Sequence, residues 1–254
     1  MFKFFLVLVI VFFPIFSKAE SSRFEKVWTF EYSTLVTSYM VAESNTVQSK
    51  PREYKDLFLF VDHDGHILAL NKNSGSLVYK TKLGSVAGRR GFAINEELGE
   101  IVIVAGSILY IIDAVSGQIL KKTKTNYSVV EPILTSKCII NFGARNGIIE
   151  CHNKGLDKVL WRTQLGKTAR IWSNPLFSEK HNLIYFVTSN PGKLTNIYRE
   201  EDTYSSSLIG INAQDGSIKF HRQMIKDDLW DYDGVGKPVL IENFLNNDGE
   251  IYDL

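Results

Sequence analysis

Residues 111–121, IIDAVSGQILK, decide the fold, because the same pattern returns along the chain. An apolar run ends in an Asp-x-x-Ser-Gly turn, and a second strand-forming run follows it. Three further segments align on this turn, with the sequences ALNKNSGSLVY (69–79), CHNKGLDKVLW (151–161) and GINAQDGSIKF (210–220). The last residues of the four segments are spaced by 42, 40 and 59 positions. Repeats of this length with several short strands per unit are typical of β-propeller blades.

Strand-like runs also fill the sequence between the repeats. They are rich in β-branched and aromatic residues and lie at 57–61, 101–104, 108–112, 138–142 and 183–187. Helical periodicity is nearly absent, and Gly, Asn and Asp interrupt the connections between runs. We therefore predict an all-β fold, a β-propeller.

The last position of each repeat predicts how neighbouring blades meet. In such repeats this residue, often Trp, docks across the seam between two blades. Here it is Trp161 in one copy, with Tyr79 and Phe220 as aromatic substitutes in two others. Lys121 interrupts the pattern, so we expect its seam to be weaker or to be filled differently.

The N-terminus has the pattern of an export signal. Lys3 precedes an apolar run at 4–16, and Ser17-Lys18-Ala19 forms a small-x-small cleavage site. The pattern predicts a signal peptide at 1–19 and a domain at 20–254, exported most simply to a bacterial periplasm. An uncleaved membrane anchor is the alternative interpretation.

Composition argues against two classes of partner. The formal net charge is +1 and the basic residues are dispersed, so the chain shows no electrostatic footprint for nucleic acid. The sequence has no polybasic patch that would predict firm contact with a membrane. The roughly 235 residues that remain after signal removal are enough for one hydrophobic core.

The two cysteines, Cys138 and Cys151, flank a predicted hairpin. A two-residue type I′ turn at Asn146-Gly147 would pair Phe142 with Cys151 and place the thiols four residues apart along one face, roughly 13 Å. Bridged Cα atoms lie within about 7 Å. We therefore predict no disulfide unless the register slips.

Five blocks in the second half of the chain occur in a characteristic order. They are Trp172, LIYFVTSNP (183–191), REEDTYSSS (199–207), INAQDGSIKF (211–220) and DLWDYD (228–233). This order resembles the quinoprotein alcohol and glucose dehydrogenases that use pyrroloquinoline quinone (PQQ), and DLWDYD matches without a change. The resemblance covers about residues 27–240 and is strongest after Trp172.

The resemblance implies an eight-bladed propeller of PQQ-like repeats, of which this chain would form about four to five blades. The family's catalytic Asp would then lie beyond the chain. We expect the N-terminal half of such an enzyme, inactive alone, with a companion chain completing the ring. A self-sufficient small propeller is the alternative.

The resemblance also assigns site residues. Trp172 matches the Trp on which the quinone lies, and Asn190, 18 residues later, matches a calcium ligand. A flat apolar plate beside an amide oxygen suits a planar, polyanionic cofactor held by calcium. Arg90 matches an Arg that hydrogen-bonds the cofactor, and Gly143-Ala144 match a cofactor-binding pair. The alternatives are a core aromatic for Trp172, a turn residue for Asn190 and a surface side chain for Arg90.

Several residues depart from the family's pattern. Gly84-Ser85 stands where the alcohol dehydrogenases carry adjacent cysteines, and Arg145 stands where a Glu binds calcium. A cation at this position would repel calcium. The loop at 201–203 is altered, and Asp227 replaces a His. These departures predict a divergent site.

Two other constellations predict ordinary structure. Asp62-His63-Asp64-Gly65-His66 looks like a metal site, but Asp-Gly between two apolar strands is typical of a hairpin turn. The acidic residues at 227–233 belong to a loop that is mainly structural in the resembling family. No Ser-His-Asp order, Walker loop or HExxH pattern is present.

Two functions follow from these observations. The first is an exported PQQ- and calcium-dependent dehydrogenase, or part of one, that oxidises an alcohol or a sugar. The second is a non-catalytic periplasmic propeller that binds proteins, similar to the lipoprotein of outer-membrane barrel assembly. Such scaffolds share the repeats but lack DLWDYD and the Trp172/Asn190 pair, which favours the enzyme.

Overall fold

The computed structural model describes residues 27–30, 49–62, 64–85, 90–166, 169–190, 203–226, 236–246, 248 and 250–253. These sequence predictions lie outside the described residues: the signal peptide at 1–19, the first two residues of the altered loop at 201–203, and the acidic stretch at 227–233 with Asp227 and the DLWDYD block. Among the described residues no helix is long and apolar enough to cross a membrane.

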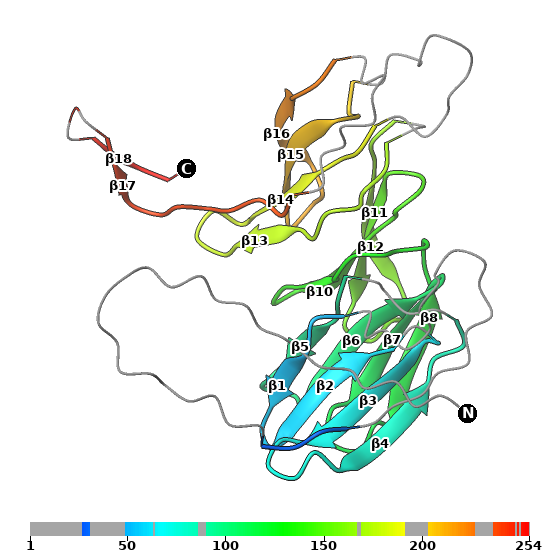
Figure 1. Ribbon diagram of the computed structural model, residues 1–254. Coiled ribbons are helices and arrows are strands. Elements are labelled where there is room, and N and C mark those ends of the chain that lie inside the picture. The colour runs from blue at the N-terminus through cyan, green and yellow to red at the C-terminus, as the bar shows by residue number, and fades with distance from the viewer. Residues whose placement is uncertain are drawn as a thin grey trace, which may run out of the picture.

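The described chain folds into four antiparallel sheets of four strands, which confirms the all-β propeller (Figure 1). Within every sheet the strands are paired in chain order. Blade 1 consists of β1 (Arg52–Tyr54), β2 (Leu57–Val61), β3 (His66–Asn71) and β4 (Leu77–Lys82); blade 2 of β5 (Ala93–Asn95), β6 (Glu100–Ala105), β7 (Ile108–Asp113) and β8 (Ile119–Lys124); blade 3 of β9 (Ile133–Leu134), β10 (Cys138–Phe142), β11 (Ile148–Asn153) and β12 (Val159–Gln164); and blade 4 of β13 (Leu176–Ser178), β14 (Leu183–Val187), β15 (Ser207–Asn212) and β16 (Ile218–Gln223). A separate pair follows, β17 (Phe244–Leu245) with β18 (Ile251–Tyr252).

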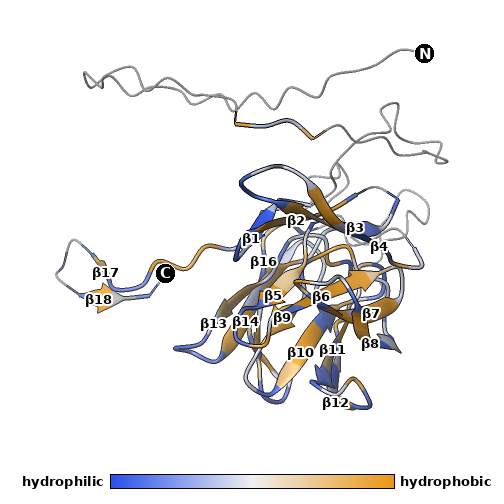
Figure 2. Cartoon of the chain, turned by 90° about the horizontal axis from the view of Figure 1, so that it is seen from below, coloured by the Kyte–Doolittle hydropathy of each residue, from blue (hydrophilic) through white to orange (hydrophobic). Residues whose placement is uncertain are grey.

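The core lies in the seams between blades. The middle strands of each blade are almost fully buried, whereas the fourth strands β4, β8, β12 and β16 are largely exposed. One apolar cluster fills the seam between blades 1 and 2, a second the seam between blades 2 and 3, and a third the seam between blades 3 and 4. Figure 2 shows the hydrophobic residues concentrated in the strands and the hydrophilic ones in the connecting turns.

The first polar residue of the repeated turn stabilises it by accepting main-chain hydrogen bonds. In blade 2, Asp113 Oδ1 accepts hydrogen bonds from the main-chain N–H of Val115 at 3.1 Å and of Ser116 at 2.7 Å. Gly117 closes the turn at φ 73°, a conformation that favours glycine. The hydrogen bonds from Ser116 lower the pKa of Asp113 below its usual range. The turn motif that predicted the blades is therefore a local hydrogen-bonding device.

Aromatic residues dock on this turn across the seams, as predicted. Trp161 Nε1 donates to Ala213 O at 3.3 Å, and Tyr79 Oη donates to Ala114 O at 3.0 Å. Each ring covers the turn glycine so closely that a Cβ at Gly216 would lie 2.5 Å from Trp161. Phe220, the equivalent residue of blade 4, is 40% exposed.

Blade 1 receives the same contact from outside the four sheets. Trp28 Nε1 donates to Lys72 O at 2.8 Å, and its ring would meet a Cβ at Gly75 at 2.5 Å. Lys72 holds the same turn position as Ala114 and Ala213. Residues 27–30 therefore take the place that the fourth strand of a preceding blade would take.

The seam at Lys121 is filled differently. The turn of blade 3 departs from the Asp-x-x-Ser-Gly pattern. It places Leu156 at φ 60°. Leu156 is buried and packs with Val102, Val104 and Ile139 in the seam between blades 2 and 3. An aliphatic side chain from the turn of blade 3 thus occupies a seam that lacks an aromatic from β8.

The prediction of unbridged cysteines is wrong. Cys138 and Cys151 form a disulfide with their Cα atoms 5.7 Å apart. The hairpin between β10 and β11 turns through a four-residue loop at 144–147, closed by Gly143 N–H donating to Ile148 O at 2.7 Å. This loop moves the register by two residues, so Cys151 lies opposite Ile140 and diagonally beside Cys138.

Candidate functional site

The segments that carry Trp172 and Asn190 lie side by side in blade 4. Ile171 forms an antiparallel bridge with Thr188, and Ser189 N–H donates to Arg170 O at 2.9 Å. Trp172 is half-buried and packs against the cluster between blades 3 and 4. Asn190, two residues beyond the bridge, is 7% exposed. The structure thus joins the two segments, and the binding of one ligand by both side chains stays a prediction.

The Gly143-Ala144 pair borders the same seam from blade 3. Ala144 N–H donates to Tyr127 O at 2.8 Å, and the Ala144 side chain is fully buried in the cluster against which Trp172 packs. Gly143 is required by the loop itself, since a Cβ there would lie 2.8 Å from Ile148 O. Ala144 therefore belongs to the cluster against which Trp172 packs, and Gly143 has a structural role in the loop.

Arg90 reaches this region from the segment before blade 2. Its main-chain N–H donates to Val129 O at 3.0 Å, and its carbonyl accepts from Asn174 Nδ2 at 2.9 Å. Asn174 follows Trp172 by two residues, so a side-chain hydrogen bond ties two predicted cofactor segments together. The Arg90 side chain is exposed, and its contact with a cofactor stays a prediction.

A third hydrogen-bonded group lies at the first strands of the blades. Arg52 Nη1 donates to Phe92 O at 2.8 Å and to Glu131 Oε1 at 2.7 Å. Glu131 N–H donates to Asn174 Oδ1 at 3.1 Å. Arg52, Glu131 and Asn174 thus connect segments of all four blades. Sequence reasoning missed all three, because their pairing depends on residues 43 to 79 positions apart and follows no motif.

The residues present fit a planar anion. Trp172 offers a half-buried ring, and Arg90 and Arg145 bring guanidinium groups from the two preceding blades. The Arg145 guanidinium lies over the Tyr127 ring, 4.7 Å from its centroid, and Tyr127 packs against the same cluster as Trp172. Guanidinium groups and an aromatic plate are the side-chain types that suit a carboxylated quinone.

The donors among the described residues do not fit a calcium ion. Calcium takes six to eight oxygen ligands, with carboxylates prominent among them. Of the predicted ligands, Asn190 offers an amide oxygen, whereas Arg145 is a cation. Glu131 brings a carboxylate to these segments, but that carboxylate is paired with Arg52.

A second buried polar network lies on the other face of blade 3. Glu150 Oε1 accepts from Arg162 Nη2 at 2.5 Å, and its Oε2 accepts from Thr125 Oγ1 at 3.0 Å and lies 3.5 Å from His152 Nε2. Burial alone would raise the pKa of Glu150, but hydrogen bonds from His152, Arg162 and Thr125 together outweigh it and lower the pKa to about 2. This pKa identifies Glu150 as a buried, ionised structural residue.

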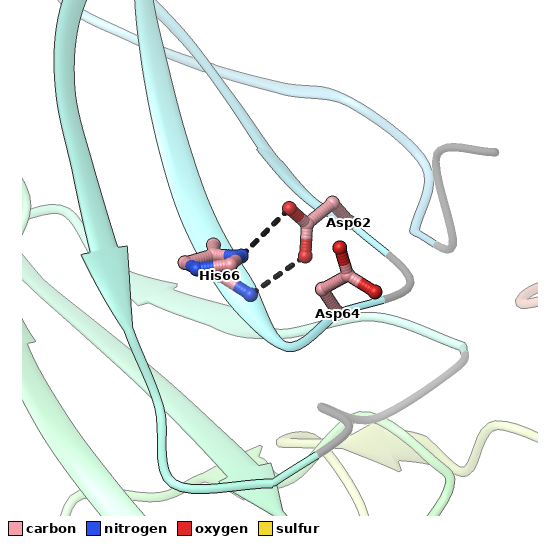
Figure 3. Close-up of side chains that lie close together, drawn as sticks. All are labelled: Asp62, Asp64 and His66. Carbon is pink, nitrogen blue, oxygen red and sulfur yellow. Dashed lines mark hydrogen bonds and ion pairs between the residues drawn. The ribbon is translucent and has the colours of Figure 1, made fainter. Parts of the chain in front are cut away.

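The metal-like group in blade 1 is a hairpin turn, as its sequence indicates (Figure 3). The side-chain ligand atoms of Asp62, Asp64 and His66 lie within 4.8 Å of one another. However, Asp62 uses one carboxylate oxygen to accept from His66 N–H at 2.7 Å and the other to contact His66 Nδ1 at 2.9 Å. The buried carboxylate therefore holds the turn together.

Comparison with known proteins identifies relatives. Residues 149–252 match the PQQ family model described as glucose/ethanol/alcohol dehydrogenase, beta-propeller domain. The quinoprotein alcohol dehydrogenase PedH of Pseudomonas putida is 29% identical over 195 residues, which cover 73% of this chain and 32% of PedH. Methanol dehydrogenase [cytochrome c] subunit 1 of Methylobacterium organophilum is 26% identical over 192 residues, 70% of this chain and 30% of that protein. The chain thus spans about a third of the length of these relatives.

Solved structures show the same fold. The quinohemoprotein alcohol dehydrogenase of Comamonas testosteroni superimposes with a TM-score of 0.70 at 16% identity, over 83% of this chain and 39% of that one. At this identity the likeness concerns the fold alone. The family model over residues 149–252 and the sequence relatives make this chain similar to the beta-propeller domain of the glucose, ethanol and alcohol dehydrogenases, and the solved structures share its fold.

Proposed function

We propose that this chain binds PQQ and forms part of an exported quinoprotein dehydrogenase that oxidises an alcohol or a sugar. One observation carries the proposal: segments of three blades, holding Arg90, Gly143-Ala144 and Trp172, converge on one group of contacts. Relatives named for alcohol oxidation support the substrate class. When bound, PQQ supplies the two-electron acceptor for this oxidation.

Each residue has a role toward the quinone in this proposal. Trp172 provides the plate on which the ring system lies, and its half-buried position keeps water from that face. Arg90 and Arg145 bind carboxylates by charge-assisted hydrogen bonds. Asn190, almost fully buried, orients a polar edge of the ligand. No step is assigned to calcium, because the described donors do not fit it.

The proposal extends to localisation. The Cys138–Cys151 disulfide favours an oxidising compartment, since disulfides are rare in cytosolic proteins. This agrees with the signal pattern at 1–19. Expression in a bacterial host with the native leader, followed by mass measurement of the periplasmic product, tests it. A mature N-terminus near Glu20 supports export, and an uncleaved cytoplasmic product contradicts it.

The binding proposal is tested with purified chain and PQQ in equilibrium dialysis, with EDTA present. We expect saturable binding, weakened at least about tenfold by Trp172→Ala because the stacking plate is lost. The matched control is Trp161→Ala, which removes a Trp that packs against the same cluster but docks on Gly216, in the turn between β15 and β16. Equal affinities for wild type and Trp172→Ala, or no binding by wild type, would refute the proposal.

A further inference from the structure

The Asn174 carboxamide uses both of its ends to join three blades. Its Oδ1 accepts from the Glu131 N–H of blade 3 at 3.1 Å, and its Nδ2 donates to the Arg90 carbonyl before blade 2 at 2.9 Å. Asn174 itself belongs to blade 4, between Trp172 and strand β13. Both partners are main-chain groups, so the carboxamide fixes backbone positions.

The partners of Asn174 are themselves fixed. The Arg90 N–H donates to Val129 O at 3.0 Å, which anchors the other side of the same residue. The Glu131 carboxylate is paired with Arg52 at 2.7 Å. Gly91 lies between these groups at φ 136°, and a Cβ there would be 3.4 Å from Glu131 Oε2. The segment after Arg90 therefore runs closely against Glu131, and Asn174 sets how far it lies from blade 4.

We propose that Asn174 is a positioning residue of the quinone site. Through the Arg90 carbonyl it sets the distance between the Arg90 guanidinium and the Trp172 ring, and thereby the width of the site. This inference rests on the proposed binding of PQQ by Trp172 and Arg90. It predicts that Asn174 acts on the ligand through Arg90.

Only an amide of this size serves both partners. Aspartate at the position keeps the shape and can still accept from Glu131 N–H, but it cannot donate to the Arg90 carbonyl and places a negative charge beside that oxygen. An unmade hydrogen bond plus this repulsion is expected to shift the Arg90 backbone away from blade 4. Asn174→Asp is therefore the sharpest single change.

The chain offers a matched control in the same blade. Asn212 holds the first position of the repeat turn, where Asp113 stands in blade 2. Asn212→Asp thus makes the same chemical change at a position where the fold already accepts aspartate. We expect Asn212→Asp to bind PQQ like wild type and Asn174→Asp to bind it about tenfold more weakly.

A double-mutant cycle separates positioning from general damage. If Asn174 acts through Arg90, Asn174→Asp weakens PQQ binding no further than about twofold once Arg90 is alanine, because the group it positions is gone. If the losses of PQQ affinity caused by the two substitutions multiply in the double variant, the inference is overturned. Unchanged affinity of Asn174→Asp would also overturn it. If Asn174→Asp does not fold, Arg52→Lys replaces it in the test. This variant weakens the pairing with Glu131, so we expect its affinity for PQQ to fall about threefold. An unchanged affinity would count against the inference.

Hydrogen exchange of the ligand-free chain distinguishes this inference from the proposed function. Asn174→Ala is expected to speed exchange of the Glu131 amide, whereas Asn212→Asp leaves it unchanged. If wild type does not bind PQQ but this exchange effect is seen, the proposed function fails, and Asn174 keeps only its structural role of tying the Glu131 and Arg90 backbones together. If wild type binds PQQ but Glu131 exchange is unchanged in Asn174→Ala, the proposed function stands and the positioning role of Asn174 is refuted.

Discussion

In the proposed site, Arg145 would favour an anionic ligand over a divalent cation. It follows Gly143 and Ala144, whose main chain is fixed by Ile148 O and Tyr127 O. Its guanidinium lies over the Tyr127 ring, a contact that favours a cation and holds the charge in place. An anionic ligand gains from this charge directly, and a divalent cation is repelled by it.

Arg145→Glu should therefore introduce a dependence on calcium. With EDTA, we expect this variant to bind PQQ about tenfold more weakly than wild type, because an attraction becomes a repulsion. Millimolar calcium should restore its binding and leave wild type unaffected. Isothermal titration with and without calcium measures both effects, and Lys122→Glu on the exposed strand β8 controls for net charge. Calcium-dependent binding by wild type would contradict this account.

Glu150 predicts how stability depends on pH. Its pKa is about 2 in the folded chain against a usual 4.5. A lowered folded-state pKa stabilises the fold fully above the unfolded value, and the stabilisation is lost as the pH falls from about 4.5 towards 2. At about 1.4 kcal/mol per pKa unit, the loss is at most about 3.5 kcal/mol.

Glu150→Gln should separate this contribution from general acid unfolding. We expect a lower thermal midpoint at neutral pH, because Arg162 and His152 lose their charged partner, and a shallower decline of the midpoint in the acid range. The exposed Glu96→Gln is the control and should follow wild type at every pH. Parallel curves for wild type and Glu150→Gln would exclude Glu150 as the titrating group.

At the scale of the element, we expect the aromatic contact across each seam to contribute to the free energy of unfolding. Trp161 covers Gly216 and donates to Ala213 O, whereas Phe220, at the same position of blade 4, is 40% exposed. Trp161→Ala should lower the free energy of unfolding by about 2 kcal/mol, since it leaves a gap and an unpaired carbonyl. Phe220→Ala should cost less than about 1 kcal/mol. Urea unfolding compares them, and equal losses would show that the seam contact is not the source.

Sequence reasoning succeeded for elements and failed for one register. The Asp-x-x-Ser-Gly turn is a local hydrogen-bonding pattern, so its repetition was enough to predict four blades. The hairpin at 143–148 was assigned a two-residue turn from Asn146-Gly147, but Gly143 N–H bonds Ile148 O instead. That shift of two residues is what brings Cys138 to Cys151. Composition alone does not distinguish the two loops, because both end in the same Asn-Gly pair.

At the scale of the whole molecule, the proposed site depends on contacts between blades. Motif spacing predicted that Trp172 and Asn190 come from adjacent segments of one blade, and these segments pair at Ile171 and Thr188. The ties between blades were beyond sequence reasoning: Asn174 bonds Arg90 across 84 residues, and Arg52 bonds Glu131 across 79. Such contacts depend on how sheets are placed around the ring. They identify the ring, not any single blade, as the scaffold of the site.

This arrangement predicts binding without turnover. Oxidation of an alcohol requires a base that takes the hydroxyl proton. The carboxylate that the described residues bring to the converging segments is Glu131, and its pairing with Arg52 at 2.7 Å occupies it as a structural anion. We expect purified chain loaded with PQQ to reduce no dye with ethanol or glucose beyond the rate of free PQQ, although dialysis shows the quinone bound. Full-length PedH of Pseudomonas putida is the positive control in the same assay. Sustained turnover by this chain that Glu131→Gln abolishes would instead make Glu131 the base, and the pairing with Arg52 would then be a resting state that the substrate opens.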